Sequence, residues 1–307
     1  MTSTERIVPL RFPGEVDAAP DEKLVDLCSD SRSHELHYLI LEHGAVLLRG
    51  FKVDGVEVFR EFVWTFSGKE FFDYAGGASP RHRARAAGVY NSTDYAPEIR
   101  IPLHNELSYS DVYPEHLYFM CVTRAEGGGE TTLGDGRRIL AAMDEAVVHE
   151  LRRKGVCYIR NLSAERGSGY SWSEAFESDD RLTIEQICRK QGADFKWLPD
   201  GGLQLRQVRP ATTHHPQTGE EVWFNQVSGF YFDRAELGPD VQPRLECTFG
   251  DGTEIPVEMV DHICRVLEQQ SYAHPWRKHD VVIVDNIVAL HGRLPYVGER
   301  EIVLAMT

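Results

Sequence analysis

The stretch VVIVDNIVALHGRLPYVGEREIVLAM, residues 281–306, contains two segments whose patterns predict β-strands. The first, residues 281–286, is a short apolar run that ends in Asp-Asn, which is typical of a buried strand followed by a turn. The second, residues 301–306, carries side chains that would alternate between the two faces of a sheet. One face would consist of Ile302, Leu304 and Met306, and the other of Val303 and Ala305.

Similar short strands recur upstream, separated by turns. They are LYFMCV (117–122), GVCYIRNL (155–162) and EEVWFNQV (220–227). Helical patterns interrupt them at about 136–153 and 255–270. Many short strands in a chain of 307 residues predict a jelly-roll or barrel whose interior can hold a ligand.

Helical patterns also precede the strands. Residues 21–43 carry apolar side chains at helical spacing and stop at Gly44, and a second helix is predicted at about 56–67. Between them, AVLLRGF (45–51) has the character of a buried strand.

No internal repeat, low-complexity tract or Pro/Ser linker divides the chain. We therefore predict a single domain over residues 1–307, mainly β with flanking helices and a double-stranded β-helix (jelly-roll) core. The N-terminal helical region, residues 1–44, is expected to pack on the jelly-roll.

The charge balance excludes some classes of partner. The chain has 48 acidic and 33 basic residues, a formal net charge of -15. Nucleic acids and anionic membranes both require clustered Lys and Arg, so neither is expected as a partner. No segment has the pattern of a secretory signal or the length of a membrane span. The six cysteines are scattered without a Cys-x-x-Cys pair, which favours a reducing cytoplasm over a disulfide framework or structural zinc.

Three residues could form a metal site. His104 and Glu106 in IPLHNELSYS are two positions apart, so on an extended strand their side chains would share one face. His291 follows the apolar run at 281–286. Two imidazoles and one carboxylate on one face of an octahedral ion are the arrangement of non-haem iron(II) oxygenases. On spacing alone, a surface histidine beside an unrelated glutamate remains an alternative for His104.

Two other histidine pairs have less suitable spacing. His34 and His37 are three residues apart, whereas the zinc-protease helix needs its second histidine at the fourth position. This pair is expected on a solvated helix face. His214 and His215 lie in a Pro/Gly/Thr-rich segment and are expected to be loop residues.

Taken together, four segments resemble the TauD/TfdA family of iron(II)- and 2-oxoglutarate-dependent dioxygenases, in its SyrP-like, clavaminate-synthase-like branch. The segments are residues 88–122, RAEGGGETTLGDGRRIL (124–140), VWFNQ (222–226) and DNIVALHGRLPYVGEREIVL (285–304). The resemblance implies that His104, Glu106 and His291 hold Fe(II), with glutamate in place of the commoner aspartate, as in that branch. It also matches Thr131 and Arg300 with residues that bind 2-oxoglutarate, with Arg293 as a weaker candidate. A dicarboxylate bound to iron at one end needs a cation at the other, and a planar guanidinium suits a carboxylate.

The implied activity is hydroxylation of an unactivated carbon, with O₂ and 2-oxoglutarate consumed and succinate and carbon dioxide released. Because Glu106 occupies the position that iron halogenases leave vacant for chloride, chlorination is disfavoured. Desaturation or cyclisation at the same iron site is an alternative. A second alternative is a non-catalytic jelly-roll protein that binds a metal or a small ligand. A zinc hydrolase is disfavoured because no HExxH helix is present.

The branch implies a small-molecule substrate, an amino acid or a metabolite derived from one, either free or tethered to a carrier protein. Polar residues in the matched segments are candidates to contact it, and each could equally serve the fold. They are Asn91, Ser92, Thr93, Tyr109 and Asn225. Tyr109 and Trp223 are expected mainly as core aromatics.

Overall fold

A computed structural model describes residues 12–78, 86–92, 95–167, 170–231 and 243–307. Its largest element is a six-stranded sheet in the order β1-β2-β15-β5-β18-β3. The pair β1–β2 is parallel and the other pairs are antiparallel. The strands are β1 (Gly14–Asp17), β2 (Ala45–Arg49), β15 (Val281–Asp285), β5 (His116–Thr123), β18 (Glu301–Met306) and β3 (Val89–Asn91).

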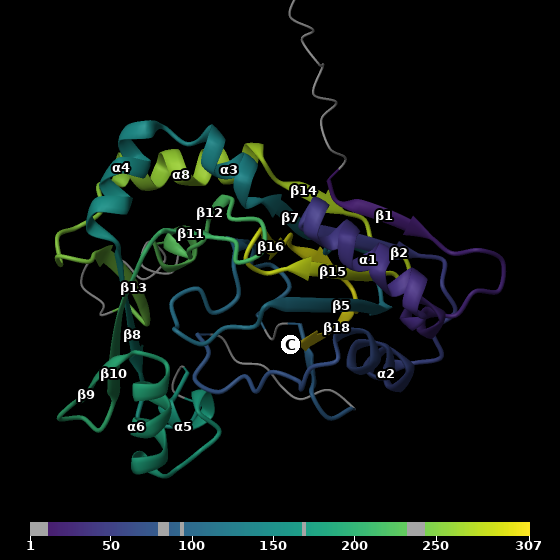
Figure 1. Cartoon of the computed structure of the whole chain (residues 1–307). Helices are drawn as coiled ribbons and strands as arrows, with labels where there is room; N and C mark the ends of the chain where they lie inside the picture. Colours follow the sequence, from purple (N-terminus) through teal and green to yellow (C-terminus); the bar gives the residue numbers. More distant parts are fainter. Residues whose placement is uncertain (1–11, 79–85, 93–94, 168–169, 232–242) are drawn as a thin grey trace, which may run out of the picture.

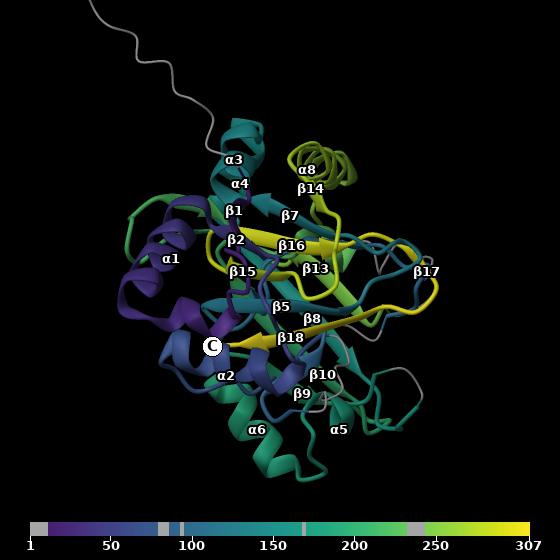
Figure 2. The same ribbon diagram turned by 90° about the vertical axis from the view of Figure 1, so that its right-hand side faces the viewer.

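A four-stranded antiparallel sheet lies over this first sheet, in the order β14-β7-β16-β4. Figure 2 shows β7 and β16 in a layer above β5 and β18, with α2 below them. Side chains from both sheets, such as Leu133, Leu290 and Leu304, share one buried core. The strands are β14 (Tyr272–His274), β7 (Thr131–Asp135), β16 (Ala289–Arg293) and β4 (Ile101–His104).

Helices cover the other face of the six-stranded sheet. The elements concerned are η1 (Leu24–Cys28), α1 (Asp30–His43) and α2 (Val56–Ser67). Phe59 and Phe62 of α2 pack in a second buried core with Val303 of β18. The alternation predicted for residues 301–306 is confirmed, since Ile302, Leu304 and Met306 belong to the first core and Val303 and Ala305 to the second.

A third sheet, β13-β8-β10-β9, extends to one side (Figure 1). It comprises β13 (Leu245–Phe249), β8 (Val156–Leu162), β10 (Leu203–Arg209) and β9 (Asp194–Trp197). Helices α5 (Trp172–Ala175) and α6 (Arg181–Lys190) lie beside it, and their side chains share a smaller third core with Leu203 and Leu205. The remaining elements are α3 (Gly136–Ala142), α4 (Glu145–Lys154), α8 (Val257–Gln269), β11 (Thr212–His214), β12 (Glu221–Trp223), β6 (Gly127–Gly128) and β17 (Tyr296–Val297).

Several predicted elements differ in detail from those observed. The helix at about 56–67 is confirmed, but the one at 21–43 is a short 3-10 helix followed by α1, which ends at Gly44 in the left-handed region (φ 74°). The helix at 136–153 is divided because Asp144 caps a new one by accepting a hydrogen bond from the Ala146 amide. Helices α5 and α6 were not predicted. None of the helices in the described part of the chain is long and apolar enough to cross a bilayer.

Candidate metal and cosubstrate site

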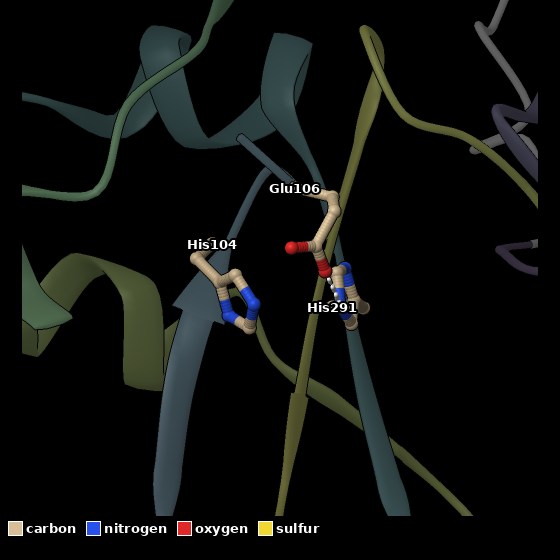
Figure 3. Close-up of side chains that lie close together, drawn as sticks. All are labelled: His104, Glu106 and His291. Atoms are coloured by element: carbon tan, nitrogen blue, oxygen red, sulfur yellow. Dashed lines mark ion pairs between the residues drawn. The ribbon is translucent and has the colours of Figure 1, made fainter. Parts of the chain in front are cut away.

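Three side chains, two from neighbouring strands and one from the turn after β4, converge at one end of the four-stranded sheet. His104 is the last residue of β4 and pairs with His291 of β16 across the ladder. With Glu106, each offers a ligand atom, and all three atoms lie within 4.8 Å of one another. Glu106 Oε2 is 3.6 Å from His291 Nε2, and the imidazole centroids are 4.3 Å apart. Figure 3 shows the three side chains directed toward a common space.

The local backbone differs from the one we predicted. Strand β4 ends at His104, so Glu106 lies in a turn and not on the strand. Leu107, next in the turn, has φ 55°, in the left-handed region. The expectation that strand alternation places His104 and Glu106 on one face is therefore wrong, although the two side chains do meet.

The donor set fits a divalent transition metal. His104 Nδ1 lies 2.9 Å from the Pro102 carbonyl oxygen and donates a hydrogen bond to it, which leaves Nε2 as the acceptor that a metal requires. Two ligand atoms about 2.1 Å from an ion and at right angles are about 3 Å apart, so the 3.6 Å between Glu106 and His291 is near that of a formed site. Two imidazoles and a carboxylate suit iron(II) and leave coordination positions open. No other group of three His, Cys, Asp or Glu side chains in the described ranges is this close.

The other histidine pairs do not form such a group. His34 and His37 are exposed on α1, where each Nδ1 lies within 2.7 Å of a backbone carbonyl of the same helix. The predicted solvated helix face is confirmed. The loop prediction for the other pair was wrong in part: His214 ends β11, while His215 is buried with Nε2 3.0 Å from Asp285 Oδ2.

A small cavity extends from the two histidines toward the arginines of the C-terminal segment. Its lining includes His104, His291, Thr131, Arg293 and Arg300. The structure thus brings together all three residues that the resemblance matched with 2-oxoglutarate and two of the three candidate metal ligands.

Arg300 supplies a partly buried positive charge to this cavity. It lies just before β18, and its Nε donates a hydrogen bond to the Gly129 carbonyl at 2.9 Å. No acidic side chain of the described residues forms an ion pair with it. Burial, with a further contribution from the charge of Arg293, lowers the pKa of Arg300 to about 10. The guanidinium remains charged at neutral pH and is suited to an anionic ligand.

Arg293 and Thr131 are held by other groups. The Arg293 guanidinium donates to the carbonyl oxygens of Tyr95, Ala96 and Ile99 at 2.6–3.1 Å, so it fixes that segment as well as adding charge. Thr131 is buried, and its hydroxyl accepts a hydrogen bond from Trp276 Nε1 at 3.0 Å.

Sequence reasoning missed Trp276. The edge of its ring contacts His274 with the two centroids 4.6 Å apart, and His274 pairs with Thr131 in the ladder between β14 and β7. A single tryptophan after a short strand gives no signal for this role.

A second, larger cavity meets the first at His104. Both are lined by His104, Tyr95 and Ile101, and the larger one also reaches Glu106. Its other walls combine aromatic rings (Tyr74, Tyr109, Phe230) with small and aliphatic side chains, and its polar groups include Gln226 and two arginines, Arg100 and Arg244.

The predicted substrate residues lie in different places. Tyr109 lines the larger cavity and Ser92 the smaller one, while Asn91 on β3 lines neither. Asn225 is buried and forms hydrogen bonds with the backbone of Ala211 and Val227, contacts that serve the fold.

Gln226, the neighbour of Asn225, was not predicted but lines the larger cavity. Thr93 lies outside the described residues, and Trp223 is a core aromatic as expected.

Tyr109 has an unusual environment. Its hydroxyl is buried without a hydrogen-bond partner among the described residues. On the ring, the guanidinium carbon of fully buried Arg160 lies 4.6 Å from the centroid. Burial raises the pKa of Tyr109 well above its usual range, so the phenol stays protonated and can donate a hydrogen bond.

Comparison with known proteins supports the resemblance noted in the sequence. The family model "Taurine catabolism dioxygenase TauD, TfdA family" matches residues 8–307. The dapdiamide synthesis protein DdaC of Enterobacter agglomerans is 36% identical over 95% of this chain and 92% of its own length. A clavaminate synthase-like protein of Arabidopsis thaliana is 30% identical over 90% of this chain and 85% of its own length.

Solved structures share the architecture. PvcB from Pseudomonas aeruginosa superposes with a TM-score of 0.57 at 18% identity, covering 96% of this chain and 86% of that protein. AAD-2, solved in complex with Mn(II) and N-oxalylglycine, gives a TM-score of 0.57 at 15% identity, covering 97% of this chain and 96% of that protein. The predicted mainly β fold with a double-stranded β-helix core is confirmed.

Proposed function

The chain belongs to the taurine catabolism dioxygenase TauD, TfdA family of Fe(II)- and 2-oxoglutarate-dependent oxygenases, and from that premise we propose which residues perform its reaction. His104, Glu106 and His291 bind Fe(II). The observation that carries this assignment is the convergence of their ligand atoms within 4.8 Å at the junction of two cavities. The bound iron supplies activation of O₂ coupled to oxidative decarboxylation of 2-oxoglutarate.

The small cavity binds 2-oxoglutarate. Arg300 pairs with the distal carboxylate of the cosubstrate, since it is a partly buried cation and no described acidic side chain forms an ion pair with it. The hydroxyl of Thr131 donates a second hydrogen bond to that carboxylate, and Arg293 adds positive charge. The keto and C1 carboxylate end then points toward His104 and His291, which line the same cavity.

The larger cavity binds the substrate, a small molecule, and excludes water from the carbon that reacts. In the balanced reaction a C–H bond becomes C–OH, with one atom of O₂ in the product and the other in succinate, and carbon dioxide leaves. We propose an amino acid or an amino-acid-derived metabolite as substrate, because the chain is similar to a protein named for dapdiamide synthesis. Tyr109 contacts it from the cavity wall. The substrate is free or tethered to a carrier protein.

A second outcome at the same iron site is desaturation or cyclisation. A tyrosine isonitrile desaturase of Pseudomonas aeruginosa is 26% identical over 63% of this chain and 53% of its own length. The position of the substrate relative to the metal decides between hydroxylation and loss of a second hydrogen. Mass spectrometry of the product distinguishes them, because hydroxylation adds one oxygen and desaturation removes two hydrogens.

We further propose that the whole chain acts as one oxygenase domain located in the cytoplasm. Leu36 and Ile40 of α1 share a core with side chains of β2 and β18, which supports the proposed packing of the N-terminal helical region on the sheet that bears the C-terminal strand. The six cysteines are free thiols, as a reducing compartment allows. A truncation lacking residues 1–44 that kept full turnover would contradict the first proposal, and recovery of the protein only from membranes or the medium would contradict the second.

The decisive experiment measures metal, cosubstrate and turnover separately. Anaerobic addition of Fe(II) and 2-oxoglutarate is expected to give a weak visible charge-transfer band, and a metabolite panel then identifies substrates that stimulate succinate release in air. His104→Ala and His291→Ala are expected to abolish both the band and succinate release. Full turnover in either variant would refute the ligand assignment. Metal binding with no succinate under any condition would favour the non-catalytic binding protein.

A further inference from the structure

One buried asparagine joins the two segments that carry the candidate metal ligands. Asn286 lies in the turn between β15 and β16 and is completely buried. Its Oδ1 accepts a hydrogen bond from the Glu106 amide at 2.7 Å, and its Nδ2 donates to the Glu106 carbonyl oxygen at 3.0 Å. Both backbone polar groups of one ligand residue are therefore held by one side chain.

Further hydrogen bonds extend this network around Asn286 and Glu106. Asn286 Nδ2 also donates to the Pro114 carbonyl at 2.8 Å, and the backbone carbonyl of Asn286 accepts from Asn105 Nδ2 at 2.7 Å. Gln226 Nε2 in turn donates to the Asn105 carbonyl at 2.7 Å. The turn around Glu106 is thus fixed by hydrogen bonds from chain positions more than 100 residues away.

Glu106 needs such a support because no strand ladder holds it. His104 is fixed by the pairing of β4 with β16, whereas Glu106 follows the end of β4 in a turn with Leu107 in the left-handed region. Without the asparagine, the buried Glu106 amide and carbonyl would lose these two hydrogen bonds, and the turn could relax toward other conformations.

We propose that Asn286 is a positioning residue that sets the Glu106 carboxylate at its distance from His291. Asn286 and His291 belong to one short segment, so a bond from Asn286 to the Glu106 backbone fixes the separation of the two ligands. The inference rests on the proposed metal site and adds a residue that does not touch the metal.

The geometry requires an asparagine amide. The position needs one acceptor for the Glu106 amide and two donors for the carbonyl oxygens of Glu106 and Pro114, which a carboxamide provides. Aspartate keeps the shape and the acceptor but has no donors when ionised. Alanine removes all three bonds.

The experiment compares Asn286→Ala and Asn286→Asp with a matched control, Asn225→Ala. Asn225 is also buried and makes two side-chain bonds to backbone, to the Ala211 carbonyl at 2.8 Å and from the Val227 amide at 3.2 Å. Co(II) alone is the probe, titrated under anaerobic conditions, with its visible d–d spectrum and dissociation constant as readouts. Thermal unfolding of each variant measures the general loss of stability.

Asn286→Ala is expected to weaken Co(II) binding by about 10- to 100-fold, the usual effect of removing a group that orients a metal ligand, and to change the d–d spectrum. Asn225→Ala should lower the melting temperature yet leave affinity and spectrum as in the wild type. In a Glu106→Ala background, Asn286→Ala should have no further effect on Co(II) affinity. Asn286→Asp, which preserves the side-chain volume, gives the same comparison if the alanine variant does not fold.

Wild-type Co(II) affinity and spectrum in the folded Asn286 variants would overturn the inference, as would an equal loss in Asn225→Ala or a full additional loss in the Glu106→Ala background. These results are distinguishable from a failure of the proposed function. If His104→Ala and His291→Ala leave Co(II) binding unchanged, the metal site itself is wrong; if they abolish binding while the Asn286 variants retain it, only this inference fails.

Discussion

The two cavities that meet at His104 differ in chemistry. The smaller one has two guanidinium groups, Arg293 and Arg300, and the buried hydroxyl of Thr131. The larger one is lined by aromatic and aliphatic side chains such as Tyr109, Phe230 and Leu245, and by two arginines, Arg100 and Arg244. In the larger cavity Arg100 forms an ion pair with Glu268, and Arg244 donates a hydrogen bond to the Ala78 carbonyl. The smaller cavity therefore suits a small dianion, whereas the larger one offers mainly shape, apolar surface and a few hydrogen bonds.

The difference explains why one cavity was easier to identify from sequence. A cosubstrate shared by a family can be bound by similar groups in its members, so Thr131 and Arg300 could be matched by their place in the family's motifs. A substrate specific to one enzyme leaves no shared motif. Of the residues that we predicted to contact the substrate, Tyr109 lines the larger cavity. Gln226 and Phe230 also line it and were not predicted.

The largest difference between the cavities is expected when the charge of Arg300 is removed, because only the cosubstrate affinity should then fall. Arg300→Met should raise the dissociation constant of 2-oxoglutarate by about 100-fold, since removing one partner of a buried charge pair costs about 2–5 kcal/mol. Co(II) affinity should not change. The measurement is a titration of the Co(II)-loaded variant with 2-oxoglutarate or N-oxalylglycine. Wild-type cosubstrate affinity in Arg300→Met would remove Arg300 from the proposed site.

A smaller effect is expected in the larger cavity. Tyr109→Phe removes only the hydroxyl, which has no hydrogen-bond partner among the described residues. The KM of the substrate found by the succinate-release screen should rise about tenfold, the value of one buried hydrogen bond. Metal and 2-oxoglutarate affinities should stay unchanged, and the melting temperature should be equal or higher because an unsatisfied polar group is lost. A fall in stability with no change in KM would assign the hydroxyl to the fold.

The contrast between local and distant contacts also decides how much of the fold was predictable. The alternation of residues 301–306 and the helix at 56–67 follow from local pattern, and both are observed. Helix α6 was missed although its cap is a local signal: Asp180 accepts hydrogen bonds from the Leu182 and Thr183 amides. The roles of Asn286 and Trp276 could not be predicted, because their partners lie more than 100 residues away.

A still smaller effect on 2-oxoglutarate affinity is expected when the hydrogen bond from Trp276 to the Thr131 hydroxyl is removed. The Thr131 oxygen accepts from Trp276 Nε1, so its own proton is free to point toward an anion. Trp276→Phe removes the donor and should weaken 2-oxoglutarate binding about fivefold, near the net value of one hydrogen bond. In a Thr131→Val background, Trp276→Phe should have no further effect on the dissociation constant. Equal effects in both backgrounds would mean that Trp276 acts on cavity packing and not through the hydroxyl.

The last prediction concerns the stability of Arg300→Met. The substitution should weaken cosubstrate binding without lowering the melting temperature of the ligand-free protein. Burial lowers the pKa of Arg300 to about 10, well below its ordinary value, so the charged form is disfavoured in the folded protein relative to the unfolded chain. This destabilisation is fully present below pH 10 and is relieved as the pH rises from there toward the ordinary value, because in that window the unfolded chain binds more protons. At pH 7.5 and without ligand, Arg300→Met should therefore melt at the wild-type temperature or slightly above it, even though it binds its cosubstrate more weakly. A 2-oxoglutarate concentration that just saturates the metal-loaded wild type should raise its melting temperature clearly and that of the variant hardly at all, since the variant binds the cosubstrate about 100-fold more weakly. A variant that melts well below the ligand-free wild type would show that the bond from Arg300 to the Gly129 carbonyl outweighs the buried charge.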